Sequence, residues 1–350
     1  MCKSLAITSG NAMKREKWTP IKVGIVGSCG HNSSVTKVAE THREFIICGI
    51  CPGPEEKSCD ILLARAQKSN PAVKVYPDYE SLLDEEKPDI LVITSYCGFH
   101  AQIAMECIKR GVHVFTEKPA ATTLEQLEEL ESVYKAQNRV KLSAMMLSRY
   151  HSSFQAVKKA YEEGKIGELR MIYAQKSYQF GARSGMYENP DYYGGTIPWV
   201  GSHAIDWIYW ISGLKFQQIY ARESRVGNQG IGELETTAVC TFELEKEVLA
   251  TCTLDLFRPA GAGKHGDDRI RLVGTKGVLE VADGQALLAD EEGIKSLEGE
   301  KGKSAFLEFI KEIQGKPSEA VKAEEVFTVT RACLLARASA ERDERMYWKY

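Results

Sequence analysis

Six short apolar segments alternate with helical segments between residues 20 and 147, and this alternation constrains the fold more than any other feature of the chain. The apolar segments are predicted strands at residues 21–26, 45–50, 73–76, 90–94, 112–115 and 140–146. Because a helical connection returns the chain to the same end of a sheet, strands joined in this way run parallel. The pattern therefore predicts a doubly wound parallel sheet with helices on both faces, preceded by an N-terminal extension at residues 1–19.

The pattern changes at about residue 148, where alternating strands replace the strand–helix repeat. Predicted strands lie at residues 170–178, 217–223, 235–244, 248–257, 268–273 and 277–281, and predicted helices at 154–163, 306–313 and 323–342. Short turns such as Lys246-Glu247 favour antiparallel connections. We therefore expect an α/β Rossmann domain at residues 20–147 and an α+β domain with a large open, mostly antiparallel sheet at residues 148–350. A sheet that is covered on one face leaves the other face for a second subunit, so a homodimer or homotetramer is expected.

The composition of the chain excludes several functional classes. The 350 residues carry a net charge of -3, so there is no basic surface for nucleic acid. No apolar run approaches the roughly 20 residues that span a bilayer. The ten cysteines lie mostly in apolar segments, which is typical of reduced thiols in a cytoplasmic protein. The loop Lys264-His265-Gly266-Asp267-Asp268 lacks a proper metal-ligand set, so we expect no metal site there.

A glycine-containing turn, Gly27-Ser28-Cys29-Gly30, follows the first predicted strand. Such a turn places the amino terminus of the next helix against a pyrophosphate, so Gly27, Ser28, Cys29 and Gly30 are predicted cofactor contacts. The usual fingerprint is Gly-x-Gly-x-x-Gly, and only Gly27 matches it, because Cys29 and Asn32 occupy the other two positions. His31 either donates a hydrogen bond to the pyrophosphate or lies exposed.

The end of the second predicted strand bears on the choice of cofactor. An acidic residue usually binds the adenosine ribose there, whereas this chain has Cys51. Glu55 and Glu56 follow shortly after, and they would repel a 2′-phosphate, with Lys57 the one cation nearby in the sequence. This charge pattern favours NAD over NADP and leaves NADP open.

The triplet Glu117-Lys118-Pro119 follows the fifth predicted strand, at the sheet edge where ligands bind. A lysine at this position can bind a substrate hydroxyl and a nicotinamide ribose together, and Pro119 restricts Lys118 to extended or turn geometry. A surface turn is the alternative interpretation. Ser95 lies at the same edge, and His100 either contacts the cofactor or caps a helix.

Three further motifs accompany this triplet: Gly194-Gly195, His203-x-x-Asp206 and the segment Arg269–Gly277. With these motifs in this order, the chain resembles the glucose-fructose oxidoreductase and inositol dehydrogenase family (Gfo/Idh/MocA) over roughly residues 20–345. The resemblance implies a dehydrogenase that transfers a hydride between NAD or NADP and a hydroxyl of a sugar, cyclitol or related polyol.

The resemblance also assigns roles to individual residues. It implies that Lys118 and His203 are catalytic and that the cofactor is contacted at Ser95, His100, Glu117 and Lys118. An unperturbed imidazole titrates near neutrality, which suits His203 to accept the hydroxyl proton. Relatives often carry an aspartate four residues before this histidine, and here the position is Trp199. A tryptophan is no base, but it can stack against a sugar ring.

The second domain supplies the expected substrate contacts, and tyrosine and arginine there suit hydroxylated or anionic substrates. The set comprises Arg149, Tyr178, Arg183, Trp199, His203, Asp206 and His265. Asp206 lies one helical turn after His203, so it orients His203, lines the pocket or caps backbone groups. Two alternatives to a dehydrogenase remain: a lyase or glycosidase-type enzyme that uses tightly bound NAD for transient oxidation, and a catalytically inactive regulator that senses dinucleotide or sugar.

Overall fold

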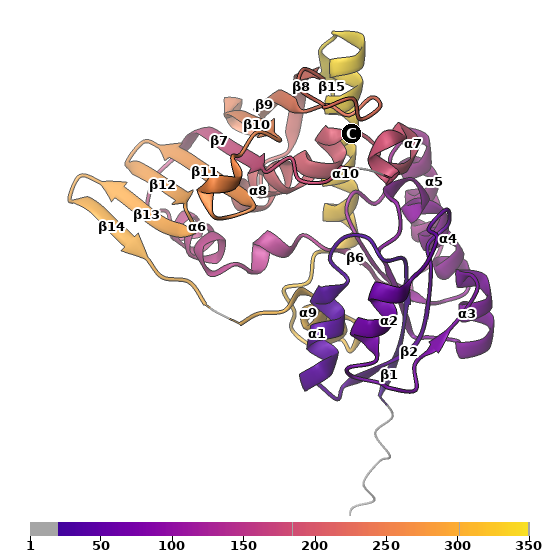
Figure 1. The fold of residues 1–350 in the computed structure, drawn as a ribbon. Helices are drawn as coiled ribbons and strands as arrows, with labels where there is room; N and C mark the ends of the chain where they lie inside the picture. The colour runs from indigo at the N-terminus through magenta and orange to yellow at the C-terminus, as the bar shows by residue number, and fades with distance from the viewer. Residues whose placement is uncertain (1–19, 184, 301, 349–350) are drawn as a thin grey trace, which may run out of the picture.

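The computed structural model describes residues 20–183, 185–300 and 302–348, so the expected extension at residues 1–19 lies outside the described residues. The first sheet has six parallel strands in the order β3-β2-β1-β4-β5-β6 (Figure 1). They are β1 (Ile21–Val26), β2 (Phe45–Cys51), β3 (Lys74–Val75), β4 (Ile90–Ile93), β5 (His113–Thr116) and β6 (Leu142–Ala144). This is the Rossmann strand order, which confirms the predicted class of the first domain.

Helices cover both faces of this sheet, which explains why its central strands are mostly apolar. All four residues of β4 are buried. Helices α1 (Ser33–Thr41) and α2 (Asp60–Ala66) pack on one face. Helices α3 (Tyr79–Glu86), α4 (His100–Lys109) and α5 (Leu124–Lys135) pack on the other.

Helix α9 (Ala305–Ile313) also packs on the first sheet, although the sequence boundaries place it in the second domain. The ring of Phe306 lies 4.9 Å from that of Phe45 and 5.3 Å from that of Phe115. The chain therefore returns to the first domain before α10 (Ala323–Arg342) begins. Figure 1 shows α9 beside α1 and α10, in yellow, running from there up to the second sheet.

The second sheet has nine strands in the order β14-β13-β12-β11-β7-β10-β9-β8-β15. They are β7 (Leu169–Tyr178), β8 (Phe216–Ser224), β9 (Thr237–Leu244), β10 (Leu249–Asp255), β11 (Gly266–Gly274), β12 (Gly277–Ala282), β13 (Gln285–Asp290), β14 (Gly293–Leu297) and β15 (Met346–Tyr347). β7 and β10 run parallel, and the other neighbouring strands run antiparallel, as the sequence predicts.

One face of the second sheet is covered and the other is open. Helices α6 (Ser152–Glu162), α8 (Ser202–Ser212) and α10 pack on the covered face. The opposite face exposes about half of the side chains of Tyr173, Val239 and Leu249. Within the described part of the chain, no helix combines the length and the apolarity that a bilayer crossing requires.

The loop that contains Gly194 and Gly195, before α8, packs against residues of the first domain. Gly194 and Gly195 adopt left-handed φ angles of 81° and 94°. A Cβ atom on Gly194 would lie 2.4 Å from Cγ2 of Thr122 in the first domain, so no side chain fits there. Arg337 of α10 donates to the Gly194 carbonyl at 2.7 Å. A π-helical turn, Ile197–Gly201, then leads directly into α8.

Candidate active site

The glycine turn after β1 is packed tightly against the ends of the neighbouring strands. Gly27 has a φ of 88°, and a Cβ atom there would lie 2.4 Å from the backbone of Ser95. Gly30 has a φ of 60°, and a Cβ atom there would lie 2.4 Å from Oε1 of Glu117. Glycine is therefore required at both positions, and the structure brings Gly27, Gly30, Ser95 and Glu117 together.

Backbone N–H groups of this turn point at carboxylate oxygens. The N–H of Ser28 donates to Oε2 of Glu56 at 2.7 Å, and the N–H of His31 donates to Oε1 of Glu117. The His31 ring also contacts that oxygen, with 2.6 Å between Nδ1 and Oε1. Although burial raises the pKa of Glu117, the hydrogen bonds from His31 bring it down to about 2. The N–H groups of the turn can thus bind anionic oxygens, and a pyrophosphate there would replace the Glu56 and Glu117 carboxylates as their acceptors.

Glu56 is an acidic residue that follows β2 by five positions and lies against the glycine turn. Its Oε1 atom is buried and has no hydrogen-bond partner among the described residues, and burial raises the pKa of the carboxyl group. The side chain of Cys51, which the sequence places where a ribose-binding acid is expected, is fully buried in the core, and the carbonyl of Cys51 accepts a hydrogen bond from Gly27 at 3.0 Å. The orphaned oxygen of Glu56 can accept a ribose hydroxyl, so these residues fit a dinucleotide.

Lys118 reaches from the end of β5 to the π-helical turn before α8. Its Nζ atom donates to the carbonyl oxygen of Trp199 at 2.5 Å, and the Lys118–Pro119 peptide bond is cis. The Trp199 ring packs on that of Tyr187, with 4.8 Å between centroids, and on the Arg183 guanidinium, also at 4.8 Å. An aromatic and cationic stack therefore fills the position where relatives often carry an aspartate.

His203 lies in the first turn of α8, and its side chain is 4% exposed. Its Nδ1 atom has no hydrogen-bond partner among the described residues. Burial and the charges of Lys118 and Lys176 lower the pKa of His203 well below 6.5. The imidazole is thus uncharged near pH 7 and has a free lone pair, but its lowered pKa makes it a weaker base than the near-neutral imidazole that the sequence predicts.

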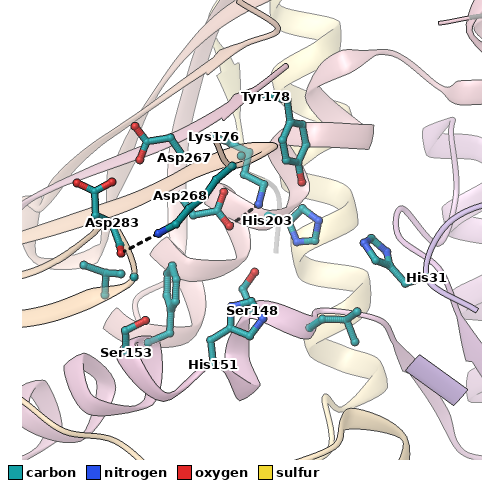
Figure 2. A pocket seen from close by; sticks show the side chains of 16 residues that line it. His31, Ser148, His151, Ser153, Lys176, Tyr178, His203, Asp267, Asp268 and Asp283 are labelled. Carbon is teal, nitrogen blue, oxygen red and sulfur yellow. Dashed lines mark hydrogen bonds and ion pairs between the residues drawn. The ribbon is translucent and has the colours of Figure 1, made fainter. Parts of the chain in front are cut away.

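A cavity of about 520 Å³ extends from the turn after β1 to the turn after β12. Three predicted site residues line it: His31, Tyr178 and His203. Figure 2 shows these side chains together with polar groups from β7, β11 and the segment before α6. The cavity therefore joins the glycine turn of the first domain to the second sheet.

Arg149 and Asp206, both predicted substrate contacts, bind each other. The guanidinium Nε lies 3.0 Å from Oδ2 of Asp206, Nη2 lies 2.6 Å from Oδ1, and Nη1 lies 2.6 Å from Oε1 of Glu325. Both side chains are almost fully buried, and neither residue is part of the cavity lining. The triad ties the start of the second domain to α8 and α10, so Arg149 and Asp206 act in the core and not, as the sequence predicted, as substrate contacts.

The remaining predicted residues surround the site without lining the cavity. His100 is fully buried, and its ring nitrogens lie 2.9 Å from the Ser95 carbonyl and 2.8 Å from the Pro119 carbonyl. It therefore joins the β4 and β5 loops and points at backbone, not at a cofactor. His265 is exposed and stacks on Tyr178, with 5.0 Å between ring centroids.

Lys176, Asp268 and His151 line the cavity but are absent from the predicted set. Lys176 had a sequence signal, because it continues the inward-facing alternation of Ile172 and Ala174 along β7. A lysine at an inward position of a half-buried strand needs a partner or a function. Among the described residues, no group of three or more His, Cys, Asp or Glu side chains is arranged to bind a metal ion.

Comparison with known proteins identifies relatives of both domains. Residues 21–145 match the model described as an oxidoreductase family with an NAD-binding Rossmann fold, and residues 154–280 match the GFO/IDH/MocA C-terminal domain. A solved structure of a proposed oxidoreductase from Thermotoga maritima is 42% identical, with a TM-score of 0.90 over 94% of this chain and 100% of that one.

Two curated relatives extend the comparison. The myo-inositol 2-dehydrogenase of Thermotoga maritima is 25% identical over 72% of this chain and 77% of its own length. The oxidoreductase YrbE of Bacillus subtilis is 30% identical over 57% of each chain. Several curated relatives are spanned only in part, over 41% to 62% of their length.

Proposed function

The chain belongs to the Gfo/Idh/MocA family of oxidoreductases with an NAD-binding Rossmann fold, and on this premise we propose that it is a dehydrogenase acting on a hydroxyl of a cyclitol, sugar or related polyol. The observation that carries the proposal is His203, a buried imidazole in the wall of a polar cavity, whose Nδ1 atom has no hydrogen-bond partner among the described residues. The myo-inositol 2-dehydrogenase among the relatives supports a cyclitol as the first substrate to test.

Different residues of the chain would bind the cofactor, position the substrate and accept the proton. NAD would supply the hydride acceptor, held by the Gly27–Gly30 turn. Lys118 positions the reacting hydroxyl at the carboxyl end of β5, and His203 accepts the proton that leaves as the carbonyl forms. The ring of Tyr178 forms part of the cavity wall beside His203.

We propose NAD as the preferred cofactor, because the Glu56 carboxyl group lies against the glycine turn, where a negative charge would oppose a nearby 2′-phosphate. The buried carboxylate would repel that phosphate, whereas its orphaned Oε1 atom suits a ribose hydroxyl. Calorimetric titration with NADH and with NADPH tests this preference. We expect NADH to bind at least about tenfold more tightly, and Glu56→Gln to reduce that ratio, since one factor of ten is about 1.4 kcal/mol. Equal affinity for both nucleotides would contradict the preference.

The chemical assignment is tested by nucleotide reduction with a panel that contains myo-inositol, D-glucose and D-xylose. Lys118→Met and His203→Asn should each lower kcat by about 10²–10⁴, the usual contribution of a positioned acid or base. Both variants should still bind NADH, which separates loss of chemistry from loss of the fold. Wild-type rates in either variant would refute the assignment.

A transient-oxidation enzyme is the second candidate, favoured by Trp199 in the place of the usual aspartate. Such an enzyme would consume a sugar with bound NAD and release no net NADH. Product formation without nucleotide reduction in the same panel would select this alternative.

A further inference from the structure

The ion pair between Lys176 and Asp268 lies in the wall of the active-site cavity. The two residues are direct partners in the register of β7 and β11, and Nζ lies 2.6 Å from Oδ2. Figure 2 shows the pair, joined by a dashed line, beside His203. The two strands therefore present a cation and an anion to the space that the imidazole faces.

One oxygen of the Asp268 carboxylate lacks a hydrogen-bond partner among the described residues, which points to a ligand. The Lys176 side chain is 4% exposed, and its Nζ atom lies 4.9 Å from the Tyr178 ring and 5.2 Å from the Trp207 ring. The Oδ1 atom of Asp268 is buried and has no hydrogen-bond partner among the described residues. Leaving a buried charged oxygen unpaired is unfavourable, so a purely structural ion pair would satisfy both oxygens.

His203 lines the same cavity, and its Nδ1 atom is likewise buried without a partner in the described part of the chain. One ligand with two polar groups would satisfy both residues. A hydroxyl group can donate to Oδ1 of Asp268 and accept from Nζ of Lys176 at once, because it is both a donor and an acceptor. A carboxylate can accept from Lys176 but would be repelled by Asp268.

We propose that Lys176 and Asp268 form the specificity site of this enzyme and bind a hydroxyl adjacent to the one that is oxidised. The inference rests on the proposed function and narrows its substrate to a neutral vicinal diol, such as a cyclitol or pyranose. It also places a carboxylate from β11 in the cavity, whereas Trp199 of the π-helical turn does not line it.

The test measures binding, so it does not depend on turnover. Saturation-transfer NMR and calorimetry on the NADH-loaded protein compare myo-inositol with its monodeoxy analogue quercitol, and D-glucose with 2-deoxy-D-glucose. We expect at least one parent compound to bind about tenfold or more tightly than its analogue, because a site built for a hydroxyl rejects a ligand that lacks it. This comparison needs no variant.

Asp268→Asn should weaken the binding of the preferred compound and abolish the difference from its deoxy analogue, and Lys176→Met should do the same. Glu280→Gln is the matched control, because Arg271 and Glu280 are also cross-strand partners, 3.3 Å apart, but lie outside the cavity lining. That control should leave both affinities unchanged.

The outcomes separate this inference from the proposed function. Binding with discrimination but without nucleotide reduction would retain the specificity site and reject the dehydrogenase. Nucleotide reduction with no discrimination, or with discrimination that persists in Asp268→Asn and Lys176→Met, would reject the specificity site and retain the dehydrogenase. Failure of every panel compound to bind would also overturn the inference.

Discussion

Replacing Arg149 by methionine removes the cation from the buried triad that it forms with Asp206 and Glu325. The guanidinium donates to both oxygens of Asp206, at 3.0 Å and 2.6 Å, and the two side chains are 5% and 2% exposed. Methionine keeps an apolar stem of similar length against the Trp210 ring, which lies 5.5 Å from the guanidinium carbon. The substitution therefore changes charge more than packing.

The expected cost follows from the carboxylate that remains. Removing one partner of a buried ion pair costs about 3–5 kcal/mol, because the other charge stays buried without compensation. Unfolding entropy averages about 2.1 cal/mol/K per residue, so over 350 residues this loss lowers the Tm by about 4–7 °C. Burial already raises the pKa of Asp206, and Arg149 opposes that effect, so removing the cation raises the pKa further.

Differential scanning calorimetry with steady-state kinetics tests this expectation. Arg149→Met should lower the Tm as stated and leave the KM for the polyol within about threefold, since the triad lies outside the cavity lining. Arg170→Met is the control, because its ion pair with Glu168 is exposed and contributes at most about 1 kcal/mol. An unchanged Tm with a large rise in KM would refute the structural role and return Arg149 to the substrate contacts.

Three further predictions concern pH, charge and assembly. Burial and the nearby Glu235 raise the pKa of Glu223 to about 8, so its ionisation opposes folding as the pH rises from 4.5 to 8. Glu223→Gln should therefore raise the free energy of unfolding by up to about 5 kcal/mol at pH 8 and change it little near pH 4. Denaturant titration at the two pH values measures this, and equal effects at both would contradict the raised pKa of Glu223. Lys176→Met should raise the pKa of His203, because it removes a charge that lowers it, and so move the acid limb of the kcat/KM profile to higher pH. An unmoved limb would exclude His203 as the base. Tyr173→Lys on the open face of the second sheet should dissociate the expected oligomer in sedimentation experiments, and an unchanged mass would exclude that face as the interface.

The sequence predicted the fold well where burial is encoded in local patterns. Apolar strands between amphipathic helices predicted the parallel sheet, and alternation predicted β7 to β12. The hairpin of β13 and β14 was not predicted, because the side chains of β14 are mostly exposed and show no alternation. The apolar side of α9 is visible in the sequence, but nothing local states which sheet it packs on.

The site was predicted only as far as motifs at strand ends allow. The sequence singles out the Gly27 turn and Lys118 because they follow strands of a parallel sheet, where ligands bind. It singles out His203 because a Gly-Gly motif precedes it at the start of a helix. The pairing of Arg149 with Asp206 spans 57 positions, and that of Lys176 with Asp268 spans 92. Such pairings depend on which strands and helices become neighbours, so the sequence did not reveal that Arg149 and Asp206 bind each other or that Lys176 and Asp268 form a pair in the cavity wall.

The most direct measurement of the central claim is the transfer of deuterium from a carbon-deuterated polyol to NAD, followed by mass spectrometry of the nucleotide. The account predicts that the wild-type protein moves the label from myo-inositol, or another panel compound, onto the nicotinamide ring. It predicts that Lys118→Met, which still binds NADH, moves almost none. Absence of label in the wild-type nucleotide, or equal labelling by the variant, would contradict hydride transfer at the site of Lys118 and His203.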